Sequence, residues 1–177
     1  WRTFLLRLGV RAAPRIEATA NGDRKCSPEL QRLLQSPQSS VRRATLECLD
    51  RHWSQYAASL NFSVQIGRAT SIRETQFSVS LRSMVAPTKK RASPAISAVF
   101  YPTPELKAVF GERLVYIDAV LSEPLLDACK VTYRLDAGAC LKRLRQLKDE
   151  GGDTTPQLHA IYRHLEQFWD RESSVIK

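Results

Sequence analysis

The sequence has few glycines, no closely spaced cysteine pair and no long apolar run, and each shortage excludes a class of protein. Its seven glycines are spread through 177 residues, so apart from Gly151-Gly152 they form no glycine-rich loop of the kind that cradles a phosphate. No apolar stretch is long enough to cross a bilayer, and the first ten residues lack the charged-then-apolar layout of a secretory signal. We therefore expect a cytoplasmic chain that contacts no membrane.

Catalytic motifs are also missing. The sequence contains no nucleophile-elbow, Walker A, dinucleotide-binding or zinc-protease motif. Asp118, Glu123 and Asp127 are acidic neighbours in the sequence, but no nucleophile or base is fixed near them, so solvated helix surfaces explain them better. The sequence therefore predicts no enzyme, no catalytic residue, no cofactor-binding residue and no cofactor.

The four cysteines form neither a disulfide framework nor a metal motif. Cys26, Cys48, Cys129 and Cys140 are far apart, and reduced, partly buried thiols are the simplest interpretation. Cys48 and His52 have the i, i+4 spacing that would bring both to one metal from a helix. Structural zinc sites usually bring a second closely spaced pair, which the sequence lacks, so we predict no metal site.

Acidic residues are fewer than basic ones: 18 Asp and Glu against 27 Lys and Arg give a net charge of +9. Such a charge favours a polyanionic partner. The basic runs are short and have no interleaved aromatic residues for base stacking, so nucleic-acid binding is an alternative that the sequence does not favour. In that alternative the contacting residues are Arg42, Arg43, Lys89, Lys90, Arg91, Lys142, Arg143, Arg145 and Lys148.

The residues that are present predict a mainly α fold with a few short β-strands, an α+β class. Hydrophobic residues make up 43% of the chain and charged residues 25%, which is ordinary for a globular protein. Three pairs of capping residue and proline predict helix starts, at Ser27-Pro28, Thr103-Pro104 and Thr155-Pro156. Further helices are expected from about Ser40, from Pro124 and after the cap Asp136. The last helix is expected to turn inward Leu158, Ile161, Tyr162, Leu165, Phe168 and Trp169.

Extended segments are expected in the middle of the chain. Apolar and polar residues alternate over 60–66, which predicts a strand, and 96–101 and 114–117 are short apolar runs of the same type. Residues 71–74 have capping-box spacing and predict a helix start, although the alternation of Phe77, Val79 and Leu81 leaves a strand open there. The basic, proline-containing segment 86–95 is expected to be the most exposed and mobile part of the chain.

A weak doubling suggests the domain organisation. The stretches 4–10 and 125–131 each precede a leucine-rich helix and then a Leu-acid-x-x-Trp sequence. We therefore expect one domain over 1–177, with similar helical sub-units at 1–58 and 121–177 flanking a mixed α/β middle at 59–120. The opening stripe of Trp1, Phe4, Leu5 and Leu8 is interpreted as the first helix of a unit whose neighbour lies outside this chain.

Several short stretches carry a family resemblance: W-x-x-F-L-L-R-L-G-V (1–10), L-D-R-H-W-S-Q-Y (49–56), S-L-R-S-M-V-A-P-T (80–88), V-F-Y-P-T-P-E-L-K-A-V-F-G (99–111) and I-Y-R-H-L (161–165). They resemble the non-ATPase segments of sacsin and NO VEIN-type proteins. Met84 stands where that family would have Trp, and Cys129-Lys130-Val131 stands where Leu-Gly-Val is typical.

In that family these segments lie downstream of an ATP-binding domain of the heat-shock-chaperone and histidine-kinase type. The resemblance therefore implies a non-catalytic structural or interaction domain of a large protein, which relays or docks beside the ATP-binding domain. Its partners would be neighbouring domains of the parent chain, or another protein. The nucleotide-binding motifs of the family are missing from this sequence, so no ATP-contacting residue is implied.

Overall fold

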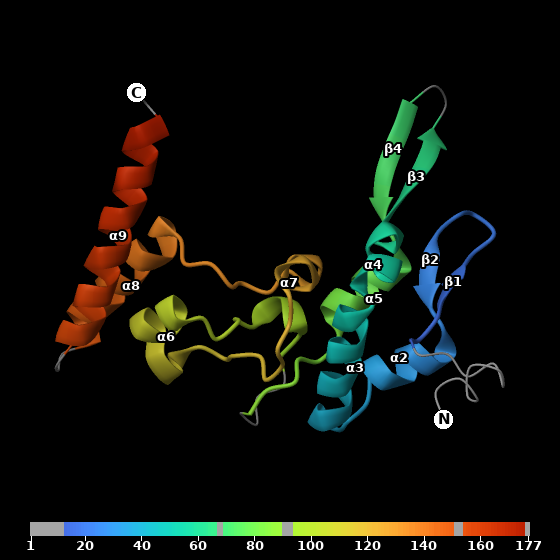
Figure 1. The fold of residues 1–177 in the computed structure, drawn as a ribbon, viewed down its shortest axis with the longest axis horizontal. Coiled ribbons are helices and arrows are strands. Elements are labelled where there is room, and N and C mark those ends of the chain that lie inside the picture. The colour runs from blue at the N-terminus through green and yellow to red at the C-terminus, as the bar shows by residue number, and fades with distance from the viewer. Residues whose placement is uncertain (1–12, 67–68, 90–93, 151–153, 176–177) are drawn as a thin grey trace. The chain divides into compact units, whose positions relative to one another are not determined.

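The structure, a computed structural model, describes residues 13–66, 69–89, 94–150 and 154–175 (Figure 1). Contacts divide the chain into two compact units: unit 1 comprises Trp1–Val99 and Ile117–Val131, and unit 2 comprises Phe100–Tyr116 and Thr132–Lys177. The fold is mainly helical with two small two-stranded antiparallel sheets, which confirms the predicted α+β class. Within the described ranges, no helix is both long and apolar enough to span a bilayer.

Unit 1 begins with a short hairpin that leads into a capped helix. Strand β1 (Ile16–Ala18) pairs antiparallel with β2 (Arg24–Cys26). Helix α2 (Pro28–Leu34) follows, and the Ser27 hydroxyl accepts a hydrogen bond from the Leu30 amide at 3.2 Å. This side-chain cap and the proline in the first turn are the features that the sequence predicted.

The next helices of unit 1 bury its leucines. Helix α3 (Ser39–Arg51) is followed by the short helix α4 (Trp53–Tyr56) and the 3-10 turn η1 (Ala57–Ser59). The Tyr56 hydroxyl donates to the carbonyl oxygen of Pro14 at 2.7 Å, which ties α4 to the start of the described chain. The largest fully buried apolar side chains of unit 1 are Leu30, Leu34, Leu46, Leu49, Phe77, Leu81, Ile96, Leu125 and Leu126.

A second hairpin extends away from helices α4 and α5 of unit 1 (Figure 1). The strand predicted over 60–66 is β3 (Asn61–Ile66), and it pairs antiparallel with β4 (Ala69–Glu74). Phe62 lies opposite Arg73 in this register. Among the described residues this sheet has two strands, so each strand has one edge without a neighbouring strand.

The helix start predicted at 71–74 is wrong, because those residues form β4. Helix α5 (Gln76–Ser83) begins instead at Thr75, whose hydroxyl accepts from the Ser78 amide at 3.2 Å and donates to the Ser59 carbonyl at 2.7 Å. Capping-box spacing satisfies only local donors, whereas pairing with β3 satisfies a full ladder of backbone groups. The strand left open at 77–81 is also wrong, because these residues lie in α5.

Two segments that the sequence predicts to be extended form isolated β-bridges instead of strands. Within 96–101, residues Ile96–Ala98 form the 3-10 turn η2, and Phe100 makes a parallel bridge with Tyr116. Within 114–117, the described pairing likewise consists of single bridges. These runs are apolar because they are partly buried, and periodicity alone does not distinguish buried irregular chain from a strand.

The segment predicted as the most exposed is buried at its start. Ala86 and Pro87 are buried, and the Pro87 carbonyl accepts from the Asp118 amide at 2.7 Å. Lys89, by contrast, is exposed. Unit 1 closes with α7 (Glu123–Cys129), the helix predicted from Pro124, and its C-cap Lys130 adopts the left-handed conformation with φ 56°.

Unit 2 packs three helices around one core. Helix α6 (Pro104–Phe110) has the predicted Thr103 cap, and the chain continues into the 3-10 turn η3 (Gly111–Arg113) with φ 55° at Gly111. Helices α8 (Ala137–Glu150) and α9 (Thr155–Val175) run side by side and both contact α6 (Figure 1). The buried core of this unit consists of Leu106, Val109, Leu135, Cys140, Leu147 and Ile161.

The inward face predicted for the last helix is too wide. Ile161 is buried, and Leu158 and Leu165 pack against the core, but Tyr162 and Trp169 are 60% and 74% exposed. Phe168 is 40% exposed as well. Because α9 lies at the edge of a three-helix arrangement, it is covered along one narrow stripe, and the aromatic side chains beside that stripe meet solvent.

The doubled pattern is divided between the two units. Trp53 of the first copy is half-buried in unit 1, whereas Trp169 of the second copy is exposed in unit 2. The stretch 4–10 and the opening stripe both lie outside the described residues. The sub-unit boundaries at 58/59 and 120/121 stay a prediction.

Candidate functional site

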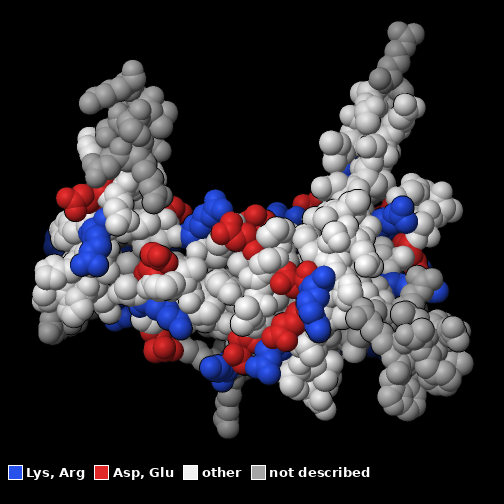
Figure 2. All heavy atoms as spheres, in the orientation of Figure 1, with Lys and Arg blue, Asp and Glu red and all other residues white. Residues whose placement is uncertain are grey.

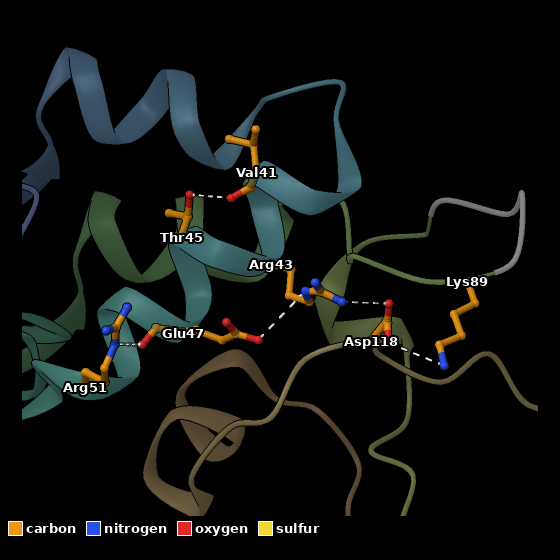
Figure 3. A network of polar contacts seen from close by, with 7 residues as sticks. All are labelled: Val41, Arg43, Thr45, Glu47, Arg51, Lys89 and Asp118. Carbon is orange, nitrogen blue, oxygen red and sulfur yellow. Dashed lines mark hydrogen bonds and ion pairs between the residues drawn. The ribbon is translucent and has the colours of Figure 1, made fainter.

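Two of the predicted polyanion contacts meet on one carboxylate in unit 1 (Figure 3). Arg43 Nη1 lies 3.4 Å from Asp118 Oδ2, and Lys89 Nζ lies 3.8 Å from Asp118 Oδ1. Arg43 Nε also lies 3.9 Å from Glu47 Oε1. These partly exposed pairs add little stability, but they neutralise the cations locally and so weaken this cluster as a polyanion site.

Arg42, beside them in the sequence, is buried and has a structural role. Its Nη1 donates to the carbonyl oxygens of Ser36 at 2.6 Å and Pro37 at 3.0 Å, which holds the turn between α2 and α3. Its guanidinium therefore presents no free surface to a partner. Lys90 and Arg91 lie outside the described residues.

The predicted contacts on α8 likewise include one buried residue and several exposed ones. Arg143 is fully buried, and its Nη2 donates to Gln157 Oε1 at 3.0 Å, which joins α8 to α9. Lys142, Arg145 and Lys148 are exposed along the helix. On the face drawn in Figure 2, acidic side chains lie among the basic ones.

Three of the four cysteines are buried thiols that resist deprotonation. All four cysteines are free, and burial raises the pKa of Cys26 and Cys140 to about 11 and that of Cys129 to about 12. Thiols with such pKa values are protonated and poorly nucleophilic at neutral pH. Among the described residues, no three His, Cys, Asp or Glu side chains are arranged to hold a metal ion.

A groove in unit 2 is the candidate site. Its volume is about 720 Å³, within the range of small-ligand and anchor-residue pockets. Its floor is apolar and is formed by Phe100, Leu106, Phe110, Leu114 and Ala139. Its rim is polar and exposed and is formed by Arg113, Thr132, Arg134, Asp136, Lys142 and Gln146.

Local structure explains how the groove forms. The Phe100 amide donates to the Val115 carbonyl at 3.0 Å, and the Tyr101 amide donates to the Thr132 carbonyl at 2.9 Å. These bonds bring three chain segments together beneath α6 and the start of α8. Helix α6 contributes Leu106 and Phe110 at i, i+4, so both side chains lie on one face of it.

Helix α8 forms one wall through Ala139, Lys142 and Gln146, which recur at i, i+3 and i+7. The wall is fixed at its start by Asp136, whose Oδ1 accepts from the Ala139 amide at 2.6 Å, as the predicted cap should. One of its carboxylate oxygens is therefore already engaged with the backbone.

The rim of the groove carries charged side chains. Arg113, Arg134 and Lys142 are cationic, and Asp136 is anionic. The Arg134 guanidinium lies 5.0 Å from the centre of the Tyr133 ring, a cation–π contact that orients its side chain. An apolar floor with a charged rim is a surface for a ligand that is apolar at its centre and polar around it.

A larger hollow, of about 830 Å³, lies in unit 1 beside Arg15, Glu17, His52 and Tyr56. Its lining mixes the apolar residues Ala13, Pro14 and Ile16 with charged residues of both signs, whereas five apolar residues line the groove. We therefore regard the groove of unit 2 as the better candidate.

Among the residues that line the groove, the sequence predicts only Lys142 as a candidate binding contact and Asp136 only as a helix cap. Residues 99–111, one of the stretches that carry the family resemblance, contain the floor residues Phe100, Leu106 and Phe110. The sequence gives no sign that these residues line a cavity. Comparison of the chain with models of protein families gives no match, and comparisons with curated proteins and with solved structures give none either.

Proposed function

We propose that this chain is a non-catalytic interaction domain of a larger, sacsin-like cytoplasmic protein, and that it docks a neighbouring domain or a protein partner beside an ATP-binding domain located elsewhere. The groove of unit 2 carries the proposal. It offers an apolar anchor site surrounded by exposed charges, an arrangement typical of protein interfaces with a desolvated centre and a polar rim.

Site-specific photocrosslinking tests this proposal. A benzoylphenylalanine placed at Thr132 has an exposed position on the rim and leaves the backbone bond from the Tyr101 amide in place. The control places the same group at Lys148, which is exposed on α8 but does not line the groove. We expect a discrete protein adduct, or a defined intramolecular crosslink in the parent protein, from Thr132 and not from Lys148. Equal crosslinking at both positions, or none at Thr132, would refute docking through the groove.

A basic nucleic-acid-binding module is the second candidate function, because Lys142, Arg145 and Lys148 are exposed on one helix of a chain with net charge +9. It requires binding to DNA or RNA whose logarithm falls steeply with the logarithm of salt concentration. In this candidate the variants Arg145→Glu and Lys148→Glu weaken nucleic-acid binding as strongly as Lys142→Glu does. A chain that binds no nucleic acid at low salt eliminates it.

A further inference from the structure

We propose that strand β3 pairs antiparallel with the β3 strand of a second copy of this chain, which joins two β3–β4 hairpins into one four-stranded sheet. This contact belongs to unit 1 and is independent of the groove of unit 2. It is favoured by the open edge of β3, by the register of the hairpin and by the lack of charge along the strand.

The edge of β3 that faces away from β4 has backbone groups without a partner strand. The hairpin extends away from helices α4 and α5 (Figure 1), and among the described residues β3 pairs only with β4. In an antiparallel pair, residues that exchange hydrogen bonds with the partner strand alternate with residues whose N–H and C=O groups point away from it. Such outward groups bind another extended strand, because a strand supplies donors and acceptors at the same spacing.

The register identifies the outward-directed residues of β3. The Thr75 amide donates to the Leu60 carbonyl at 3.0 Å, so the backbone groups of these two residues point toward each other at the base of the hairpin. By alternation, the even-numbered residues of β3 bond to β4, and Asn61, Ser63 and Gln65 direct their N–H and C=O groups outward. These three residues therefore present the donors and acceptors for a second strand.

Antiparallel pairing of β3 with itself satisfies all three outward-directed residues. With Ser63 opposite Ser63 of the second copy, Asn61 lies opposite Gln65, so every outward-directed residue meets another one. The same register places Phe62 opposite Val64 of the second copy, an aromatic and β-branched pair of the kind that stabilises neighbouring strands. Both side chains are half-buried in the single hairpin, so pairing covers apolar surface that is still exposed to water.

The lack of charge along β3 distinguishes its edge from that of β4. Residues 61–66 contain no charged side chain and no proline, two features with which proteins block exposed strand edges. The charged residues Arg73 and Glu74 lie on β4, and Glu74 is ion-paired with Arg82. In the four-stranded sheet the β4 strands are the outer ones, so no like charges of the hairpins meet across the interface, although each copy has a net charge of +9.

Charged substitutions at the centre of the pairing test the proposal. Ser63 is exposed, so Ser63→Lys and Ser63→Glu leave the hairpin itself intact, but each places two like charges directly opposite each other in the dimer. Sedimentation equilibrium of the full chain at concentrations up to about 1 mM should show a monomer–dimer equilibrium, which either substitution weakens about fivefold or more. An equimolar mixture of the two variants should associate to within about twofold of the wild-type chain, because Lys then faces Glu.

The variant Ile72→Lys is the matched control. Ile72 lies opposite Ser63 within the hairpin and is 72% exposed, but it belongs to β4, so the same new charge stands one strand away from the interface. The two introduced charges of the dimer are then separated by three strand spacings, beyond the range of strong attraction or repulsion in salt. We expect Ile72→Lys to change the dissociation constant of the dimer by less than about twofold.

Four results would overturn the proposal. A chain that stays monomeric over this concentration range has no such contact, and a dimer that Ser63→Lys leaves unchanged forms through another surface. Equal weakening by Ser63→Lys and Ile72→Lys would show general charge repulsion, and a mixture of the Lys and Glu variants that stays monomeric would exclude the antiparallel register. Far-UV circular dichroism verifies that each variant is folded, and the mixture restores association only if both are.

Discussion

At the scale of single residues, Thr75 joins two parts of unit 1. Its fully buried hydroxyl caps α5 and also donates to the Ser59 carbonyl at the base of the β3–β4 hairpin. We predict that Thr75→Ala lowers the free energy of unfolding by about 2 kcal/mol, because it removes a cap and leaves a part-buried carbonyl without this donor. Urea unfolding measures the change. Thr75→Ser keeps the hydroxyl and should lose less than half as much; an equal loss would contradict the capping role.

Burial of the cysteines predicts a pH dependence of stability. Burial raises the pKa of Cys129 from its ordinary value of 9.0 to about 12, so the folded state resists a deprotonation that the unfolded state accepts. The free energy of unfolding should therefore fall as the pH rises from about 9 toward 11. Urea unfolding at several pH values measures this slope.

The slope should be smaller in Cys129→Ala. The control is Leu126→Ala, a buried position on the same helix that opens a cavity without removing a titrating group, and it should keep the slope of the wild-type chain. Identical slopes in both variants would contradict the assignment to this thiol.

At this scale the helix caps were predictable from the sequence, and the burial of individual arginines was not. The caps Ser27, Thr103 and Asp136 follow from a polar residue at the start of an apolar periodic run, and the structure confirms all three. The burial of Arg42 and Arg143 was not predictable, because it depends on carbonyl and amide partners that only the folded chain brings near.

At the scale of elements, α9 has a buried stripe and an exposed aromatic side. Ile161 has no exposed surface, so we predict that Ile161→Ala lowers the free energy of unfolding by about 2–4 kcal/mol through a cavity. Trp169, on the same helix, is 74% exposed, and Trp169→Ala should change stability by less than about 0.5 kcal/mol. Chemical denaturation of the two variants measures the contrast. A large loss from Trp169→Ala would mean that this side of α9 is covered.

The elements also show where periodicity misleads. Alternation predicts the strand over 60–66, but capping-box spacing predicts a helix start in its partner β4, because this spacing and strand pairing compete for the same residues. The full width of the apolar stripe on α9 was assigned to the core, because the sequence does not say how many neighbours a helix has.

At the scale of the whole molecule, the chain passes between its two units more than once. Unit 2 takes residues 100–116 from the middle of the sequence and joins them to residues from 132 onward. The floor and rim of the groove come from both of these parts. A site assembled from segments so far apart has no local sequence signature, and for this reason the sequence predicts only Lys142 as a binding contact of the groove.

The proposed function also predicts how the whole chain responds to nucleotide. The sequence has no phosphate-cradling loop, and the floor of the groove is formed by apolar residues. We expect no saturable binding of ATP with Mg²⁺ by isothermal titration calorimetry and no phosphate release. Tight ATP binding with turnover would overturn the non-catalytic assignment.

The central claim is that unit 2 docks a partner through its groove, and amide hydrogen exchange measured with and without the partner that crosslinks from Thr132 tests it most directly. We predict slower exchange confined to the segments that form the groove, 100–114 and 132–146, with the remainder of unit 2 and all of unit 1 unchanged. Protection confined to unit 1, or no protection at partner concentrations that saturate the crosslink from Thr132, would contradict the claim.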